Sequence, residues 1–112
     1  MLLLEKKGKV SAGYNALLKL TAAILEGGKI KFFDDRIEFK LLWFSKILSI
    51  SEIDFVEIRA KYTFWFAHHG KTWRFLSFFC LPKDRDEIIQ VLKSLSINIK
   101  EEPNPKLKLS PY

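Results

Sequence analysis

The stretch from Gly27 to Arg59 constrains the fold more than any other part of the chain. On both sides of the Asp34-Asp35 pair, charged residues alternate with apolar ones, namely Ile30 and Phe32 and then Ile37, Phe39 and Leu41. A period of two is typical of strands with one buried face, and two aspartates suit the tip of a hairpin. The stretch therefore predicts an antiparallel meander that begins at a Gly27-Gly28 turn.

The same alternation resumes at Ile53 and runs to Ala67, which predicts one long strand. Its expected core face consists of Val56, Ile58, Ala60, Tyr62, Phe64 and Phe66. The His68-His69-Gly70-Lys71 segment is expected to form a solvent-exposed turn. Residues Thr72 to Leu81 would return as the last strand, and its apolar side chains on both faces predict a strand that is covered on both sides over its second half.

A helix is predicted after Pro82, where Asp84 and Glu87 would form a capping box in an acidic first turn. Its apolar stripe recurs every three or four residues, at Ile88, Val91, Leu92 and Leu95. Such a helix is amphipathic and should cover an open end of the curled sheet. The segment Tyr14–Leu25 is ambiguous, because its Leu and Ala content suits a helix while its place before a Gly-Gly turn suits a strand.

Three short motifs carry a family resemblance: Gly27-Gly28-Lys29-Ile30, Asp35-Arg36-Ile37-Glu38-Phe39, and Ser51-Glu52-Ile53 followed by Val56 and Ile58. Together they resemble GRAM domains and the related bacterial pleckstrin-homology-like domains, over roughly residues 14–97. The resemblance implies a mainly β fold: a curled antiparallel sheet or split barrel of about seven strands, capped by one C-terminal helix. It also favours a strand for Tyr14–Leu25. Family members that bind phosphoinositides use a basic cluster near the first loop, where this chain has Glu26 before Lys29 and Lys31.

With 112 residues, the chain has room for one hydrophobic core. We expect an N-terminal arm or edge strand (residues 1–13), the pleckstrin-homology-like domain (14–97) and an extended, proline-containing tail (98–112). No apolar run approaches the roughly 18 residues of a membrane helix. The single Cys80 suits a reducing compartment. A cytoplasmic location, with peripheral association at the membrane as an option, is the expectation.

The net charge of +6 points to an anionic partner, although the lysines are dispersed and densest at Lys6, Lys7 and Lys9. Most of this charge is expected to be a solvated surface. The two adjacent histidines have no further His or Cys partner for a metal. Ser77 and Cys80 lie in an apolar strand without the surroundings of a nucleophile. No enzymatic activity, metal or cofactor is therefore predicted.

Aromatic residues beside basic ones are the candidate contact points. Trp65 would share an outward face with Arg59 and Lys61, and Trp43-Phe44 precedes Lys46 at a bend between strands. A tryptophan beside a cation suits a membrane interface or a protein-binding edge, and it can also stack on unpaired bases. The alternative for Trp43-Phe44 is that the two rings plug the end of the barrel.

The predicted function is that of a small, non-catalytic adaptor that binds a protein segment or an acidic membrane surface, lipid headgroups included. Its expected contact residues are Lys29, Lys31, Lys46, Arg59, Lys61 and Trp65. One alternative is an OB-like binder of single-stranded nucleic acid, which the interspersed acidic residues disfavour, so that nucleic acid is not the expected partner. Another is a homodimeric structural protein, because a basic edge strand with apolar neighbours can be buried between two copies.

Overall fold

The computed structural model describes residues 1–15 and 17–101 and is mainly β. Its strands are β1 (Leu2–Lys7), β2 (Lys9–Gly13), β3 (Lys19–Ala22), β4 (Lys29–Phe33), β5 (Arg36–Leu41), β6 (Phe44–Ser49), β7 (Ile53–Arg59), β8 (Thr63–His68), β9 (Phe75–Phe79) and β10 (Ile99–Glu101). Short 3-10 turns are η1 (Ile24–Glu26), η2 (Ile50–Glu52) and η3 (Pro82–Asp84), and the helix is α1 (Arg85–Ser94).

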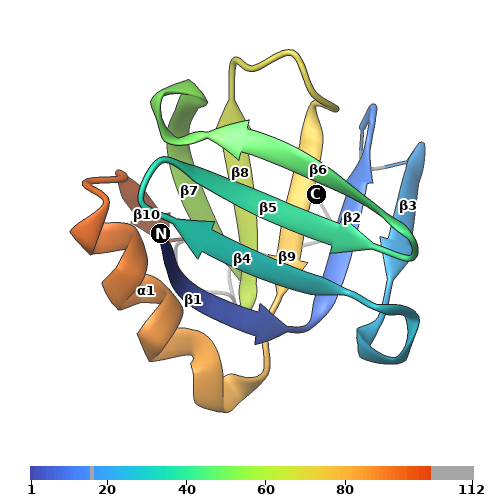
Figure 1. Cartoon of the computed structure of the whole chain (residues 1–112), viewed down its shortest axis with the longest axis horizontal. Coiled ribbons are helices and arrows are strands. Elements are labelled where there is room, and N and C mark those ends of the chain that lie inside the picture. Colours follow the sequence, from blue (N-terminus) through green and yellow to red (C-terminus); the bar gives the residue numbers. More distant parts are fainter. Residues whose placement is uncertain (16, 102–112) are drawn as a thin grey trace, which may run out of the picture.

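The strands form two layers that face each other (Figure 1). One sheet has the order β1-β4-β5-β6 and the other the order β10-β7-β8-β9-β2-β3. Neighbouring strands are antiparallel except β10, which is parallel to β7. Within the described residues no strand pairing joins β6 to β7, so the sheets do not close into a barrel.

Two bent segments connect the layers, because β1 continues into β2 at Gly8 and β3 continues into β4 through η1 and Gly28. The two segments approach closely at the bend, where the Gly8 amide donates to the Gly28 carbonyl at 3.1 Å. A Cβ atom at position 28 would lie 2.3 Å from the carbonyl oxygens of Ala22 and Gly8. Glycine is needed here for close backbone approach.

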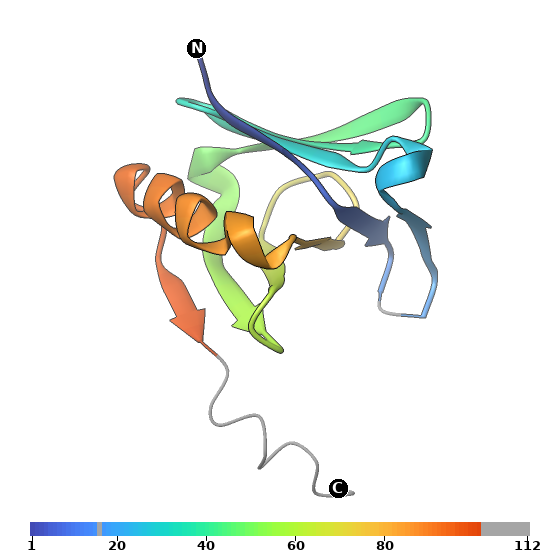
Figure 2. The same cartoon turned by 90° about the horizontal axis from the view of Figure 1, so that it is seen from below.

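The core lies between the layers, where Phe39 of one sheet meets Phe66 of the other edge to face, with ring centroids 4.9 Å apart. The predicted meander is confirmed for β4, β5 and β6, with the Asp34-Asp35 pair at the tip between β4 and β5. It does not extend to Arg59, because β7 belongs to the other sheet. The predicted helix is also confirmed: Ile88 and Leu92 are fully buried. Figure 2 shows α1 at one end of the molecule, as expected for an amphipathic cap.

The single long strand predicted from Ile53 to Ala67 is wrong. It is a hairpin in which β7 and β8 pair with Arg59 opposite Thr63, and residues 60–62 form the connection. Ala60 and Lys61 have φ values of 51° and 70°, in the left-handed region that reverses the chain. Ala60 is consequently exposed rather than in the core, whereas the other predicted core positions of this stretch remain buried or partly buried.

Two further strand predictions need correction. Of the segment Tyr14–Leu25 only Lys19–Ala22 is a strand, and Ile24 and Leu25 belong to η1. The last strand is shorter than expected, Phe75–Phe79, and is not covered on both faces: Phe79 is 43% exposed. The reason is that α1 packs across the end of the sheets beside β1 instead of over the outer face of β9.

Two predictions about polar residues near turns are also wrong. His68 is buried rather than in an exposed turn. Its ring is held by hydrogen bonds with the Trp73 carbonyl and from the Gly70 amide, each at 3.0 Å. The expected capping box of α1 is absent, since the Asp84 side chain makes no cap hydrogen bond and pairs with Lys6 at 3.2 Å.

The chain termini contribute strands to both sheets. Residues 1–13, expected as an arm or an edge strand, form β1 at the edge of the four-stranded sheet and β2 inside the other, where Val10 and Ala12 are fully buried. The expected tail begins with β10, which pairs with β7. The rest of that tail, residues 102–112, lies outside the described residues.

Candidate functional site

The end of the molecule opposite α1 is apolar and open to solvent. The β2–β3 turn, η1 and the β5–β6 turn all lie at the right-hand end in Figures 1 and 2, whereas α1 lies at the left. Leu25 is 99% exposed, Leu17 91% and Trp43 86%. We call this surface the apolar end; its exposed residues are Tyr14, Leu17, Leu18, Ile24, Leu25, Leu42 and Trp43.

Local backbone geometry holds these side chains outward. Leu42 has a φ of 49° in the two-residue turn that projects Trp43, and Gly27 has a φ of 86° where η1 ends. The two turns are neighbours, because a Cβ on Gly27 would lie 3.2 Å from the Leu42 carbonyl. In the β2–β3 turn, the Asn15 side-chain oxygen accepts the amides of Leu17 and Leu18, each at 2.8 Å.

A hollow of about 350 Å³ opens beside the apolar end, between the β2–β3 hairpin and the loop before β9. It is lined by Ala12, Gly13, Tyr14, Leu17, Leu18, Lys19, Leu20 and Trp73. The predicted contact residue Lys46 has its ammonium 4.0 Å from the centroid of the Trp73 ring, near this hollow. Trp43 does not plug the barrel, since it points into solvent; the side chain of Phe44 lies outside the described part.

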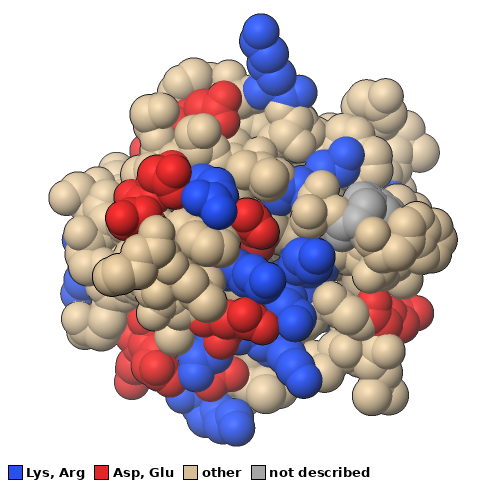
Figure 3. Space-filling view, in the orientation of Figure 1, with Lys and Arg blue, Asp and Glu red and all other residues tan. Residues whose placement is uncertain are grey.

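A row of lysines crosses the outer face of the four-stranded sheet, next to the apolar end. Lys7 of β1, Lys29 of β4 and Lys40 of β5 lie directly opposite one another in register, and we call them the lysine row. Like charges in adjacent cross-strand positions are destabilising by themselves. Figure 3 shows the basic side chains gathered in the middle of this face, with mainly uncharged surface at its right-hand end.

The next row on this face places Lys31 between Glu5 and Glu38. Glu5 pairs with Lys29 at 3.1 Å, and this hydrogen bond, together with the nearby charges of Lys31 and Lys7, lowers the pKa of Glu5. Within the described residues, Lys7, Lys31 and Lys40 form no ion pair. Glu5 thus neutralises Lys29 and leaves the other three lysines charged, so this part of the face has an excess of positive charge.

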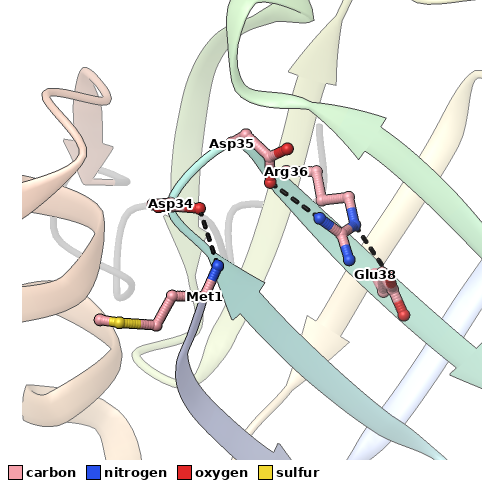
Figure 4. A network of polar contacts seen from close by, with 5 residues as sticks. All are labelled: Met1, Asp34, Asp35, Arg36 and Glu38. Atoms are coloured by element: carbon pink, nitrogen blue, oxygen red, sulfur yellow. Dashed lines mark hydrogen bonds and ion pairs between the residues drawn. The ribbon is translucent and has the colours of Figure 1, made fainter.

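The far end of the same face is neutralised. Figure 4 shows Arg36 between two carboxylates, Asp35 at 2.9 Å and Glu38 at 3.0 Å, and the amino group of Met1 at 3.1 Å from Asp34. The guanidinium also lies 3.9 Å from the centroid of the Phe33 ring. Charges are thus balanced at the β4–β5 turn and unbalanced at the lysine row.

The six predicted contact residues do not form one site. Lys29 and Lys31 lie on the four-stranded sheet, whereas the β7–β8 hairpin of the other sheet carries Arg59, Lys61 and Trp65. Arg59 lies over the Trp65 ring at 4.4 Å and pairs with Glu57 at 2.6 Å. Lys61 is in the left-handed turn.

Sequence reasoning missed two residues of the lysine row and the exposed leucines of the apolar end. Lys7 belongs to the densest run of lysines in the sequence, which was a usable signal, but its pairing with β4 was not evident from that run. Lys40 looked like one charge of an alternating strand. Leu17 and Leu25 lay in a segment whose apolar residues suited a buried strand, so nothing in the pattern indicated that they are exposed.

The described residues offer neither a metal-binding cluster nor a reactive thiol. The described residues contain no cluster of three or more His, Cys, Asp or Glu side chains that could hold a metal ion. Burial, with a smaller effect of the Asp84 charge, raises the pKa of Cys80 to about 11, so its thiol is protonated at neutral pH. Within the described part, no helix has the length and apolar character needed to span a membrane.

No protein-family model matches the chain, and a search of curated proteins gives no significant match. The resemblance to GRAM and pleckstrin-homology-like domains therefore stays a prediction, and function has to be inferred from the geometry of the surfaces.

Proposed function

We propose that this protein is a non-catalytic adaptor module of the pleckstrin-homology-like type that docks on acidic membrane surfaces. The observation that carries the proposal is the contact between two surfaces: the apolar end and the lysine row. Lys29 directly follows the Gly27-Gly28 turn after η1, and Lys40 lies two residues before Leu42. The apolar end and the lysine row are therefore adjacent.

Each surface suits a different layer of a bilayer. Exposed leucines and a tryptophan are unfavourable in water and favourable at the boundary between headgroups and acyl chains, where tryptophan is enriched. Lysines near an anionic leaflet contribute about 1 kcal/mol each, and this attraction acts over a Debye length of about 8 Å. An anionic bilayer would also relieve the repulsion within the lysine row.

The strand order supports the fold part of the proposal. If β1-β2 and β3-β4 are each counted as one bent strand, seven strands precede α1, which agrees with the roughly seven-stranded, helix-capped arrangement that the resemblance implies; β10 is an additional short strand after the helix. The helix covers the end opposite the proposed docking surface and leaves that surface accessible.

Vesicle flotation tests this function. The protein should float with phosphatidylcholine vesicles that contain phosphatidylserine, and much less with phosphatidylcholine alone. Two double variants, Leu25→Ser with Trp43→Ser and Lys29→Glu with Lys40→Glu, should each weaken binding at least about tenfold.

The matched control is Lys83→Glu with Lys93→Glu, which makes the same charge change on exposed lysines at the helix end. This control should retain at least half of the binding. Absence of binding to the serine-containing vesicles, or an equal loss in the control, would refute the proposal, because the docking surface would then be irrelevant.

A further inference from the structure

The outer face of the six-stranded sheet carries aromatic rings that are each paired with a cation. Distances from the cation to the ring centroid are 4.0 Å for Lys100 over Phe55, 4.4 Å for Arg59 over Trp65, 5.3 Å for Lys19 over Phe75 and 5.6 Å for Lys9 over Phe79. We call these rings and cations the aromatic face. It belongs to the opposite layer from the lysine row.

Acidic residues, which alternate with basic ones along the sequence, are largely absent from this face. Glu57 is in register with Trp65, and Arg59 neutralises it. Within the described residues, Lys9, Arg74 and Lys100 form no ion pair. The other acid of β7, Asp54, pairs with His69 at 2.8 Å. Further ion-paired acids lie on the outer face of the four-stranded sheet or around α1.

A hollow of about 270 Å³ lies on this face beside Trp65. It is lined by Tyr14, Asn15, Arg59, Trp65, Arg74 and Phe75. Rings and guanidinium planes offer flat surfaces to a planar ligand, while Arg74, which forms no ion pair within the described residues, offers positive charge. The combination fits a planar group that is attached to an anion, as in a nucleotide.

The floor beyond the hollow is shallow. Trp65, Ser77, Ser11 and Thr21 follow one another in register across β8, β9, β2 and β3. The side chains of Ser77, Ser11 and Thr21 are short, and the hydroxyl oxygens of Ser11 and Thr21 lie 2.9 Å apart. A chain lying across the sheet could therefore run from ring to ring. From β8 to β3 this path covers three strand spacings, which is about 14 Å and enough for about two nucleotides.

We infer that the aromatic face binds single-stranded nucleic acid, with bases on the rings and phosphates beside Lys9, Arg74 and Lys100. Single strands are bound in this way by sheets whose aromatic residues stack on bases while cations follow the backbone. A duplex keeps its bases inside and cannot use the rings, and an acidic peptide would use only the cations. The inference goes beyond the proposed membrane function, since it concerns the other layer of the molecule.

The test is fluorescence anisotropy of a labelled oligo(U) of about 12 nucleotides, with a duplex of the same length as competitor. The single strand should bind more tightly than the duplex, and the affinity should fall steeply with salt. Trp65→Ala should weaken binding about tenfold or more, and Trp65→Phe, which keeps a stacking ring, should retain most of it. Arg74→Glu with Lys100→Glu should weaken it at least as much.

The matched control is Lys7→Glu with Lys40→Glu on the opposite sheet, which should leave oligo(U) binding within about twofold. Thermal unfolding verifies that each variant is folded; if Trp65→Ala is not, the two charge variants decide. No binding of oligo(U), equal affinity for the duplex, or equal loss in the control would each overturn the inference. Vesicle binding is measured with the same variants, so failure here and failure of the membrane proposal are distinguishable.

Discussion

The two ends of this molecule use leucine in opposite ways. At the helix end, Leu92 is fully buried, and Lys6 bridges Asp84 at 3.2 Å and Glu87 at 2.7 Å. At the apolar end, Leu17 and Leu25 are almost fully exposed. Apolar side chains thus stabilise the fold where an element covers them. Where nothing among the described residues covers them, they are available for binding.

Thiol reactivity should show the largest contrast between the ends. Cys80 is fully buried and should react with a thiol reagent only when the protein opens, whereas Leu25→Cys in a Cys80→Ala background should react at once. The rates at pH 8 should differ by a factor on the order of 10³ or more. Rapid labelling of Cys80 in the folded wild type would contradict the proposed burial.

The same cysteine predicts a stability change at high pH. Its folded pKa, raised to about 11 by burial, exceeds that of the unfolded chain, which is near 9. The folded state therefore holds the proton more tightly, and this contribution is full below pH 9 and is lost between pH 9 and 11. In urea unfolding, the wild type should therefore lose more stability than Cys80→Ala between pH 9 and pH 11. The same pH dependence in both proteins would contradict the raised pKa.

Truncation of the helix end should cost the most folding free energy. Leu92→Ala removes a fully buried side chain and should lower the free energy of unfolding by about 2–5 kcal/mol, measured in urea. The exposed neighbour Lys93→Ala is the control and should change it by less than about 0.5 kcal/mol. A small effect of Leu92→Ala would mean that α1 is not packed as described.

An intermediate effect is expected for Lys6, which joins β1 to the helix end. Lys6→Ala leaves the buried Asp84 without this partner and should cost about 1–3 kcal/mol, while Lys7→Ala should be close to neutral. Hydrogen bonds to Glu87 and Asp84 raise the pKa of Lys6. The stabilisation is therefore full below the ordinary lysine pKa and is lost as the pH rises through the folded value, which unfolding at pH 8 and pH 11 would reveal.

Substitution at the apolar end should have the smallest effect on stability. Leu25→Ser with Trp43→Ser should change the free energy of unfolding by less than about 0.5 kcal/mol, because both side chains are in water. The same pair should weaken vesicle binding. A loss of several kcal/mol would place these residues in the core and would remove the contrast between the ends.

The long strand predicted from Ile53 to Ala67 shows what the alternation of apolar residues cannot predict, namely a turn within the pattern. Residues that pair across β7 and β8, such as Val56 with Phe66, have numbers of the same parity, because the connection at 60–62 has an odd length. Apolar residues thus continue at even positions through the hairpin. The period of two is the same for one long strand and for this hairpin, so it gave the right inward-facing residues, apart from Ala60 in the turn, and the wrong number of strands.

The candidate surfaces were harder to predict, because they combine distant segments. Lys29 and Lys31 were chosen from the sequence, but the lysine row needs Lys7 and Lys40, which become neighbours only when β1 and β5 pair with β4. Arg59 and Trp65 were expected to share a face and do. Their neighbours in the hollow, Arg74 and Phe75, come from the start of β9 and the residue before it, farther along the chain.

The sequence by itself determined which residues form strands with an inward face and which form the amphipathic helix, because local periodicity decides what a strand or a helix can bury. Tertiary structure alone decided which lysines adjoin, which rings meet which cations, and which leucines stay in water. Those outcomes depend on strand register and on where α1 packs, and both are set by contacts between residues far apart in the chain.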